Sequence, residues 1–315
     1  MSKKFLRLLS LTLALCLCFA LFACGGTQEP ESEPTEPSVE QESEPEFNWT
    51  IDRGTPNPEM PTKVIFILVD GMRPDALEQI PHAEVMRQNS YYTYKAQSVV
   101  PPITLPCHVS IFHSVDPSVH GVTENTLITY KGTTIYDVLT ENGYHSSMIY
   151  SWEPLRDLIK PGNDVYTYRK TSGVVIGEAV NEELTNEALF YLEMGDPDFT
   201  FLYLGHPDSM GHTYEWMSQE YLDALQSSWN RIARIVDKYS KTHTIIVTAD
   251  HGGHNKSHGK DIPEDMNVPL YILSPNVEPG EIQGDTSLLD IMPTVVDLFG
   301  IEPVADFQGK SLLPK

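Results

Sequence analysis

The sequence predicts an α/β domain with a mostly parallel central sheet and helices on both faces. Three continuous apolar runs, at 63–69, 199–204 and 244–248, indicate buried strands, because a strand with one face in water alternates apolar and polar residues. Segments with the apolar spacing of helices separate these runs, as in sheets whose neighbouring strands are parallel. Such sheets place their ligand sites beyond the carboxyl ends of the strands. Polar residues directly after these strands are therefore candidates for function.

The first 47 residues do not have the composition of a folded domain. Three basic residues precede an apolar run at 8–23, which is too short for a comfortable membrane span and has the form of a secretion signal. The following stretch is rich in Glu, Pro and Ser and cannot bury enough apolar surface to fold. We expect a signal peptide at 1–23, a disordered acidic tether at 24–47 and a single domain at 48–315.

The end of the signal contains Leu-Phe-Ala-Cys-Gly-Gly around Cys24. This segment resembles the lipobox of bacterial lipoproteins, in which the cysteine is lipidated and becomes the new N-terminus. The resemblance implies that Cys24 carries a lipid anchor and that the domain is exported to the extracellular face of the cell membrane. A cleavage site of small residues with an incidental cysteine is the alternative.

The composition argues against nucleic acid and anionic lipid as partners, and it excludes a disulfide bond within the expected domain. Acidic residues outnumber basic residues by 44 to 21, a formal net charge of −23, which repels nucleic acid and anionic lipid. We expect a monomer that does not bind nucleic acid, and anionic substrates would have to be drawn by bound metal. Of the four cysteines, only Cys107 lies in the expected domain, so no disulfide can form within it.

A helix is expected directly after an extended, proline-containing segment. The prolines before Thr104 keep the chain extended, and Pro106 suits the first turn of a helix that runs to Phe112. Thr104 then stands at a helix N-terminus, where free N–H groups and the helix dipole favour a phosphate-like anion. A capping role is the alternative for Thr104.

The remaining elements follow from apolar spacing and from Gly, Pro and Asn at their ends. Residues 151–173 are rich in Tyr, Trp, Arg and Lys, and we expect them to be irregular and to face the substrate. We also expect a loop at 115–125, a helix at 133–142, a strand at 145–150, helices at 178–194 and 215–241, a last strand at 269–273 and a closing helix at 287–299.

Each of the three buried strands leads into an aspartate, namely Asp70, Asp208 and Asp250. His212 is four residues after Asp208, so one helical turn places both side chains on one side. Histidines also follow Asp250 closely. A mixture of carboxylates and imidazoles suits a borderline divalent ion, whereas calcium prefers oxygen ligands alone. The strand ends supply enough ligands for two metal ions, although Asp70 taken alone would equally suit a helix N-cap.

The chain resembles the alkaline phosphatase superfamily, specifically its nucleotide pyrophosphatase/phosphodiesterase (type I phosphodiesterase) branch. The matching pieces are VDGMRPDAL, PITLPCHVSIF, VDPSVHGVTEN, PDSMGH and ADHGGH through SHG, which lie within residues 64–299. The resemblance implies an alkaline-phosphatase-like fold and hydrolysis of phosphodiester or pyrophosphate bonds in nucleotide-type small molecules. It also implies two divalent metal ions, zinc first and manganese as an alternative.

The resemblance assigns a role to each residue that matches a family motif. Thr104 matches the nucleophile, which forms a phosphothreonine intermediate, and Asn125 matches the residue whose amide binds a phosphate oxygen. One ion would be held by Asp70, Thr104, Asp250 and His251, and the other by Asp208, His212 and His258.

The last histidine ligand departs from the pattern of many larger members, in which it lies far downstream. We prefer His258 to His254 because Gly259 repeats the His-Gly pair of the family. His254 and His206 then lie outside the ligand set. The other histidines expected to be structural are His108, His113 and His120.

Related reactions remain as alternatives. Sulfatases use a Cys/Ser-x-Pro-x-Arg motif, which is absent here because His-Val-Ser-Ile follows Cys107. A phosphomonoesterase or phosphonate-ester hydrolase would use the same machinery, and superfamily monoesterases add cations that bind the terminal phosphate. The candidates for such cations are Arg156, Lys160, Arg169 and Lys170.

A tethered solute-binding or interaction lipoprotein with a degenerate site is the alternative from a different class. Such a module has no need for a complete set of metal ligands in register with a hydroxyl. The leaving group of an enzyme is not specified by these motifs. Four aromatic residues could stack on a nucleobase or could equally be packing residues, namely Tyr150, Trp152, Tyr166 and Tyr168.

Overall fold

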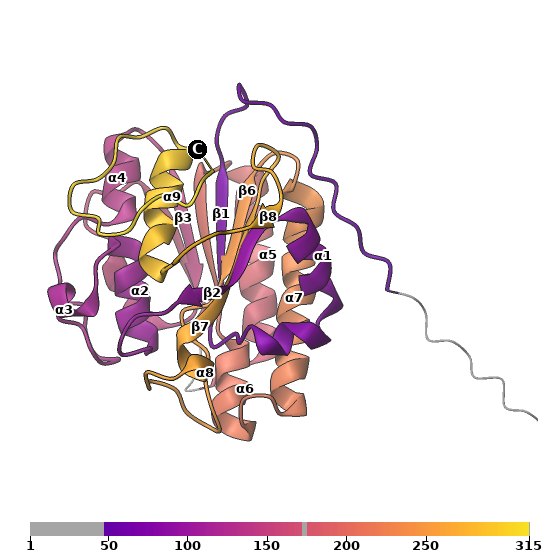
Figure 1. Cartoon of the computed structure of the whole chain (residues 1–315). Helices are drawn as coiled ribbons and strands as arrows, with labels where there is room; N and C mark the ends of the chain where they lie inside the picture. Colours follow the sequence, from indigo (N-terminus) through magenta and orange to yellow (C-terminus); the bar gives the residue numbers. More distant parts are fainter. Residues whose placement is uncertain (1–46, 172–174, 315) are drawn as a thin grey trace, which may run out of the picture. The chain divides into compact units, whose positions relative to one another are not determined.

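Eight strands form one sheet in the part of the chain that the structure describes, residues 47–171 and 175–314 (Figure 1). The structure is a computed structural model. The strands are β1 (Val64–Val69), β2 (Tyr91–Gln97), β3 (Ser146–Tyr150), β4 (Val165–Arg169), β5 (Phe199–Leu204), β6 (Thr244–Thr248), β7 (Asn267–Leu273) and β8 (Gly280–Glu281).

The sheet is mostly parallel, which confirms the predicted fold class. Its order is β4-β3-β5-β1-β6-β7-β2-β8, and neighbouring strands are parallel except where β7 pairs with β6 and with β2. The three strands predicted from continuous apolar runs, β1, β5 and β6, lie side by side and are buried along their whole length. Their apolar sequences suit the centre of a sheet that is covered on both faces.

Helices lie on both faces of the sheet (Figure 1). On one side, α2 (Thr104–His113) packs against α9 (Ile291–Leu298), with α4 (Ile135–Glu141) beside β3. On the other side, α7 (Gln219–Tyr239) packs against α1 (Pro81–Asn89) and α5 (Glu178–Met194). The shorter elements are η1 (Asp75–Gln79), α3 (Pro117–His120), η2 (Glu153–Leu158), α6 (His206–Tyr214), α8 (Pro263–Met266) and η3 (Leu288–Asp290).

The carboxyl ends of the three central strands lie at nearly the same level. Val69 at the end of β1 pairs with Leu204 at the end of β5, and Leu68 pairs with Thr248 at the end of β6. The N–H of Asp70 continues this pairing and donates to the carbonyl of Leu204 over 3.0 Å. Residues that follow these strands therefore meet at one edge of the sheet, as the rule for parallel sheets predicts.

Two expectations about single segments are wrong. Residues 151–173 are not irregular throughout, because they contain η2 and the strand β4, which pairs in parallel with β3 at the edge of the sheet. The alternating burial of an edge strand gives a weaker sequence signal than a continuous apolar run. The expected loop at 115–125 contains α3, a single helical turn whose first N–H groups are capped by Asp116.

The long helix α7 begins later than expected. The prediction began at residue 215, but Ser218 accepts a hydrogen bond from the Tyr221 N–H and is the N-cap. The two residues Glu215 and Met217 have φ of 94° and 70°, values that a right-handed helix does not allow. The helix α1 and the strand β2 were not predicted, and β2 pairs with β7 and β8 on the far side of the sheet.

The chain divides into two units at residues 46 and 47, and only the second unit, from Phe47, lies among the described residues. The expected signal peptide at 1–23, the lipid anchor at Cys24 and the tether at 24–47 fall outside those residues, except for Phe47. Within residues 47–171 and 175–314, no helix combines the length and the apolar character that a membrane crossing requires.

Candidate metal centre

The three strand ends deliver the predicted ligands to one place. Asp70 directly follows β1, and Asp250 and His251 follow β6 after a single alanine. The third segment is α6, which begins two residues after β5 ends and places Asp208 in its first turn. His212 lies one turn further along α6, as the spacing of four residues predicts.

The first cluster, called here the buried group, consists of Asp70, Asp250 and His251. The Nε2 atom of His251 lies 3.3 Å from Oδ1 of Asp70 and 3.5 Å from Oδ2 of Asp250. All three side chains are at most 1% exposed. The main chain and one phenol brace the group: Oδ1 of Asp250 accepts the N–H groups of Gly71 and His251, and Tyr203 donates its hydroxyl to Oδ2 of Asp70.

The second cluster, called here the open group, consists of Asp208, His212 and His258. Oδ1 of Asp208 lies 3.5 Å from Nε2 of His212 and 3.8 Å from Nε2 of His258. The side chain of His212 is 44% exposed and that of Asp208 is 17% exposed. The geometry therefore groups His258, and not His254, with the ligands of α6.

The histidines present the nitrogen that a metal ion needs. Nδ1 of His251 lies 2.8 Å from the Gly252 carbonyl, Nδ1 of His212 lies 3.0 Å from that of Lys256, and Nδ1 of His258 lies 2.9 Å from that of Pro102. A carbonyl only accepts, so each Nδ1 must carry the proton and donate. Each Nε2 then keeps a free lone pair, which points toward the carboxylates of its group.

The donor set fits two divalent cations. One oxygen of each aspartate, Oδ1 of Asp70, Oδ1 of Asp208 and Oδ2 of Asp250, is buried without a hydrogen-bond partner among the described residues. Burial, and then repulsion from the other two carboxylates, raises the pKa of Asp70 well above its usual range. Burial also raises the pKa of Asp208 and of Asp250. Clustered carboxylates of this kind require a positive charge if they are to stay ionised.

Burial favours the neutral imidazole, the form that ligates metal, at His251 and His258. Burial lowers the pKa of His251 to about 3. Burial, followed by repulsion from His251, lowers the pKa of His258 to about 3. The two rings are stacked, with centroids 3.7 Å apart and planes 12° from parallel, so the two groups lie next to each other.

Thr104 lies between the groups at the start of α2. Its Oγ1 is 3.2 Å from Nε2 of His251. A cavity of about 250 Å³ opens there, and it is lined by Asp70, Thr104, Asn125, Trp152, Ile176, Tyr203, Asp208, Ser209, His212 and His258. Thr104 therefore faces the same space as ligands of both groups, and it does so from a helix N-terminus, which favours an anion.

Asn125 is held in a defined orientation at the rim of this cavity. Its Oδ1 accepts the N–H of Leu105 over 2.9 Å, in the first turn of α2. Because the oxygen is used, the amide NH₂ is the part of the side chain that remains for a phosphate oxygen. The loop that carries Asn125 is thus tied to the helix that carries Thr104.

The remaining histidines do not join either group. His254 pairs through Nδ1 with Oδ1 of Asp265 at 2.7 Å, and His206 is half-buried. His113 and His120 lie near 3.0 Å from Thr133 and Ser110. His108 is different, because its Nδ1 lies 2.8 Å from the Thr104 carbonyl and 3.6 Å from Oδ2 of Asp250. It therefore lies directly behind the buried group.

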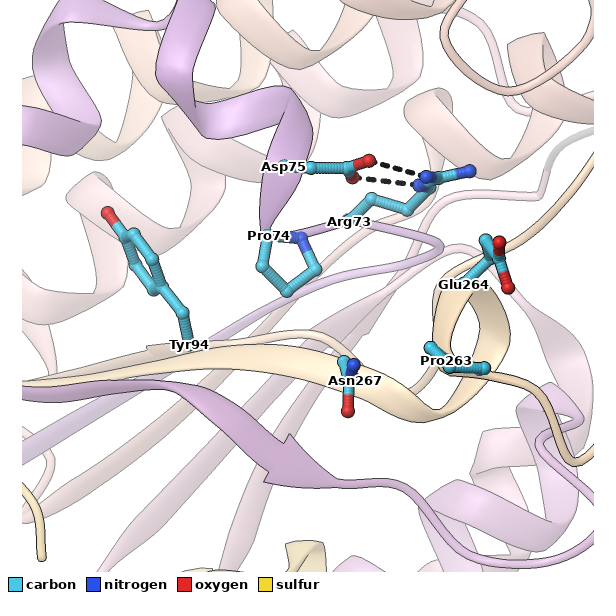
Figure 2. A pocket seen from close by; sticks show the side chains of 7 residues that line it. All are labelled: Arg73, Pro74, Asp75, Tyr94, Pro263, Glu264 and Asn267. Carbon is cyan, nitrogen blue, oxygen red and sulfur yellow. Dashed lines mark hydrogen bonds and ion pairs between the residues drawn. The ribbon is translucent and has the colours of Figure 1, made fainter.

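A second cavity, of about 240 Å³, lies behind the loop that follows β6 (Figure 2). It is lined by Arg73, which is the one basic residue of the VDGMRPDAL motif. Figure 2 shows that Arg73 points toward Asp75. The two contacts between these side chains measure 2.9 and 2.5 Å. It also donates to the carbonyl of Gly253 over 2.9 Å. Arg73 thus braces the loop from outside, and it does not line the cavity beside Thr104.

Sequence reasoning missed two side chains that support the centre, Tyr203 and Trp216. Tyr203 lies within β5, where an aromatic residue in an apolar run reads as ordinary core. Trp216 lies inside a segment that was predicted to be the start of a helix. In both cases the functional contact is made with Asp70 or with Gly71 beside it, more than a hundred residues away in the sequence.

The family model for type I phosphodiesterase / nucleotide pyrophosphatase matches residues 64–267. The 2,3-bisphosphoglycerate-independent phosphoglycerate mutase of Haloquadratum walsbyi is 30% identical over 168 residues, which are 50% of this chain and 31% of the mutase. Human ectonucleotide pyrophosphatase/phosphodiesterase family member 1 is 26% identical over 220 residues, which are 62% of this chain and 24% of the human protein. The chain thus spans less than a third of the length of these relatives.

A solved structure shows the same fold. An inactive form of murine ectonucleotide pyrophosphatase/phosphodiesterase 5 in complex with AMP matches with a TM-score of 0.65 and 15% sequence identity. The match covers 77% of this chain and 96% of the murine chain. The family model covers well over half of the sequence, from β1 to the start of β7, and includes every predicted ligand. The protein belongs to the type I phosphodiesterase / nucleotide pyrophosphatase family.

Proposed function

We propose that the protein hydrolyses phosphodiester or pyrophosphate bonds of nucleotide-type small molecules, with Thr104 as nucleophile and two divalent ions, zinc by preference, as cofactors. The observation that carries this proposal is the position of the Thr104 hydroxyl. It contacts His251 of the buried group and faces the same cavity as the ligands of the open group. A binding module would not need a nucleophile in register with two complete ligand sets.

The residues divide the reaction into two displacements. In the first, Oγ1 of Thr104 loses its proton and bonds to phosphorus, while the bond from phosphorus to the departing alcohol or phosphate breaks and the departing oxygen takes up a proton. In the second, water attacks the phosphorus of the phosphothreonine, which still carries the other ester group of the substrate. The bond from phosphorus to Oγ1 breaks, Thr104 regains its hydroxyl, and a phosphomonoester leaves. When bound, the two ions would lower the pKa of the hydroxyl and stabilise the charge on the leaving oxygen. The Asn125 amide and the start of α2 would bind the other phosphate oxygens.

The charges around the cavity favour a diester over a monoester. All four basic residues considered for gripping a terminal phosphate have carboxylate partners: Arg156 with Glu153 and Asp157, Lys160 with Asp137, Arg169 with Glu153, and Lys170 with Glu183. No lysine or arginine lines the cavity in the described part of the chain, and residues 172–174 include none in sequence. Among the described residues, the second negative charge of a monoester therefore meets no cationic side chain in the lining of this cavity.

Of the four aromatic candidates for a nucleobase, only Trp152 lines the cavity. Tyr166 donates to Glu187 and stacks on Tyr191, and Tyr168 donates to Glu183, so both are fixed against α5. Tyr150 is only 3% exposed. We infer that Trp152 is the aromatic surface available to the part of the substrate that departs from phosphorus.

The proposal is tested with zinc-loaded protein and two chromogenic substrates, a bis-nitrophenyl phosphodiester and a nitrophenyl phosphomonoester. We expect kcat/KM for the diester to be higher by at least about tenfold, a preference worth only about 1.4 kcal/mol. Acid quenching during turnover of the diester, followed by mass spectrometry, should show a nitrophenyl phosphoryl group on the peptide that contains Thr104. A preference for the monoester, or a phosphoryl group on no residue, would contradict the proposal.

We also propose that Cys24 anchors the exported domain to the extracellular face of the membrane and that the domain acts there as a monomer on small phosphoesters. The support is the sequence Leu-Phe-Ala-Cys-Gly-Gly after a short apolar segment. Metabolic labelling with a fatty acid should label the wild-type chain and not Cys24→Ala. Labelling of both chains, or of neither, would exclude an anchor at this residue.

A further inference from the structure

One indole contacts all three segments that deliver the metal ligands. Trp216 lies between α6 and α7 and is only 5% exposed. Its Nε1 donates over 2.9 Å to the carbonyl of Gly71, the residue after Asp70. Its ring lies edge-on to that of His212, with centroids 5.1 Å apart, and 5.9 Å from that of His258. Two of the three ligands of the open group therefore rest against this ring.

Three motif glycines make room for the indole. A Cβ on Gly211, which precedes His212, would lie 2.7 Å from the ring, and one on Gly71 would lie 3.2 Å from it. A Cβ on Gly253 would overlap the ring. Gly211 stands inside α6, where glycine weakens a helix and therefore needs a packing reason. Close approach to the indole thus explains the glycines at 211 and 253, whereas Gly71 also has φ of 70° and a Cβ there would lie equally close to Asp208.

The backbone around Trp216 is unusual in a way that fits this contact. Its neighbours Glu215 and Met217 have φ of 94° and 70°, which residues with a side chain rarely adopt. Its own N–H donates over 2.7 Å to the carbonyl of Asn255, which has φ of 49°. Strained conformations of this kind persist where the surrounding contacts over-determine them, and they cluster at functional sites.

We propose that Trp216 is a positioning residue that assembles the open group by fixing the ring of His212 and by holding the 253–258 segment against α6. This inference rests on the proposed function, because it takes the open group to hold a metal ion. Trp216 touches neither the substrate cavity nor Thr104, so its effect passes through the ligands. Outer residues that orient metal ligands typically change metal affinity by about 10- to 100-fold.

The test compares Trp216→Leu with Trp229→Leu. Trp229 is equally buried, in α7, and packs against Tyr271, so it controls for the loss of a large core side chain. Zinc per chain is measured after dialysis against buffered zinc, together with the thermal midpoint of each protein. We expect about two ions in wild type and in Trp229→Leu, and about one in Trp216→Leu.

Two milder variants, one of them with a matched control, keep the test informative if a leucine variant does not fold. Trp216→Phe retains a ring and should weaken the second ion by about tenfold, with kcat restored by added zinc. Gly253→Ala should have the same effect by displacing the indole, whereas Gly280→Ala in β8, where a Cβ lies 3.9 Å from its nearest neighbour, should have none. Two tightly bound ions in both Trp216→Phe and Gly253→Ala would overturn the inference.

The wild-type measurement separates this inference from the proposed function. If the wild-type chain binds two ions but has no phosphodiesterase activity, the proposed reaction fails while the comparison of metal contents stands. If the wild-type chain binds fewer than two ions, both proposals fail. If wild type is active with two ions and Trp216→Leu is folded, active and equally loaded, only the role of Trp216 is excluded.

Discussion

The buried group and the open group contain similar ligands but are built differently. The buried group stands on the ends of β1 and β6, and its carboxylates are braced by two main-chain N–H groups and the hydroxyl of Tyr203. The open group stands on α6 and a loop, and its histidines are oriented by a carbonyl contact each and by packing against the Trp216 ring. The open group also reaches solvent through His212, which is 44% exposed.

In the proposed reaction, this difference assigns a separate part to each group. The hydroxyl of Thr104, the proposed nucleophile, contacts the buried group, whose side chains follow central strands and are at most 1% exposed. The open group reaches solvent through His212, which suits the departure of the leaving group and the entry of water in that proposal. The buried group is rigid and the open group is accessible to solvent. We therefore expect the two groups to respond differently to mutation, acid and chelators.

The largest effect is expected at the hydroxyl beside the buried group. Thr104→Ala removes the nucleophile and should lower kcat for a phosphodiester by at least about 1000-fold. Zinc content should stay near two ions per chain, because the carboxylates and histidines of both groups remain. Thr104→Ser keeps an attacking oxygen and should retain part of the activity. A Thr104→Ala protein with unchanged activity would reject the mechanism.

The next effect separates the two groups directly. Asp250→Asn replaces a braced carboxylate that is 0% exposed, and activity should fall by about 100-fold or more without recovery in excess zinc. His212→Asn alters the open group, and its loss of activity should recover as the zinc concentration rises. Zinc titrations of both variants check this difference. Full rescue of Asp250→Asn would show that the groups are equivalent.

Acid should destabilise the fold through His113, a histidine outside both groups. This effect comes from protonation of a buried side chain and is distinct from loss of metal. Burial lowers the pKa of His113 to about 4, whereas the unfolded value is 6.5. The contribution of neutral His113 to the free energy of unfolding is complete above pH 6.5. It falls as the pH drops from 6.5 toward 4, because in this range the unfolded chain takes up the proton and the folded chain does not. At pH 5 this amounts to about 2 kcal/mol.

Denaturant unfolding of zinc-loaded protein between pH 7 and pH 5 measures this loss. His113→Asn can still donate to the carbonyl of Thr133 but cannot titrate, so its stability should fall less over the same range. If wild type and variant lose the same free energy of unfolding, the acid sensitivity comes from the metal ligands or from other groups.

The smallest effect concerns the order in which the ions leave. A chelator should remove the ion of the open group about tenfold faster, a difference of about 1.4 kcal/mol, because that group is exposed and lightly braced. Metal content should therefore fall from two to one before it falls further, and activity should be lost in the first phase. Simultaneous loss of both ions would remove the distinction between the groups.

Much of the centre could be predicted from the sequence because its ligands follow buried strands. Continuous apolar runs identify β1, β5 and β6, and parallel pairing brings their ends together without further information. The spacing of Asp208 and His212 then gives one face of a helix. The choice of His258 over His254 depended on resemblance to the family, and the grouping in the structure agrees with it.

What could not be predicted depends on contacts between distant segments. Tyr203 looks like one more apolar residue of β5, and only the pairing of β5 with β1 brings its hydroxyl to Asp70. The strands β2 and β4 lie toward the two edges of the sheet, and their mixed exposure gives no continuous apolar run. Trp216 was assigned to a helix because spacing alone does not reveal the positive φ of its neighbours.

The hydrogen bond from Gly71 to Asp250 joins positions 179 residues apart. During synthesis the ribosome must therefore finish most of the domain before the buried group can exist, and a fragment that stops before Asp250 has no means to close it. Under the proposed function, the buried group can therefore bind its ion only after β1 and the segment that follows β6 have both been made.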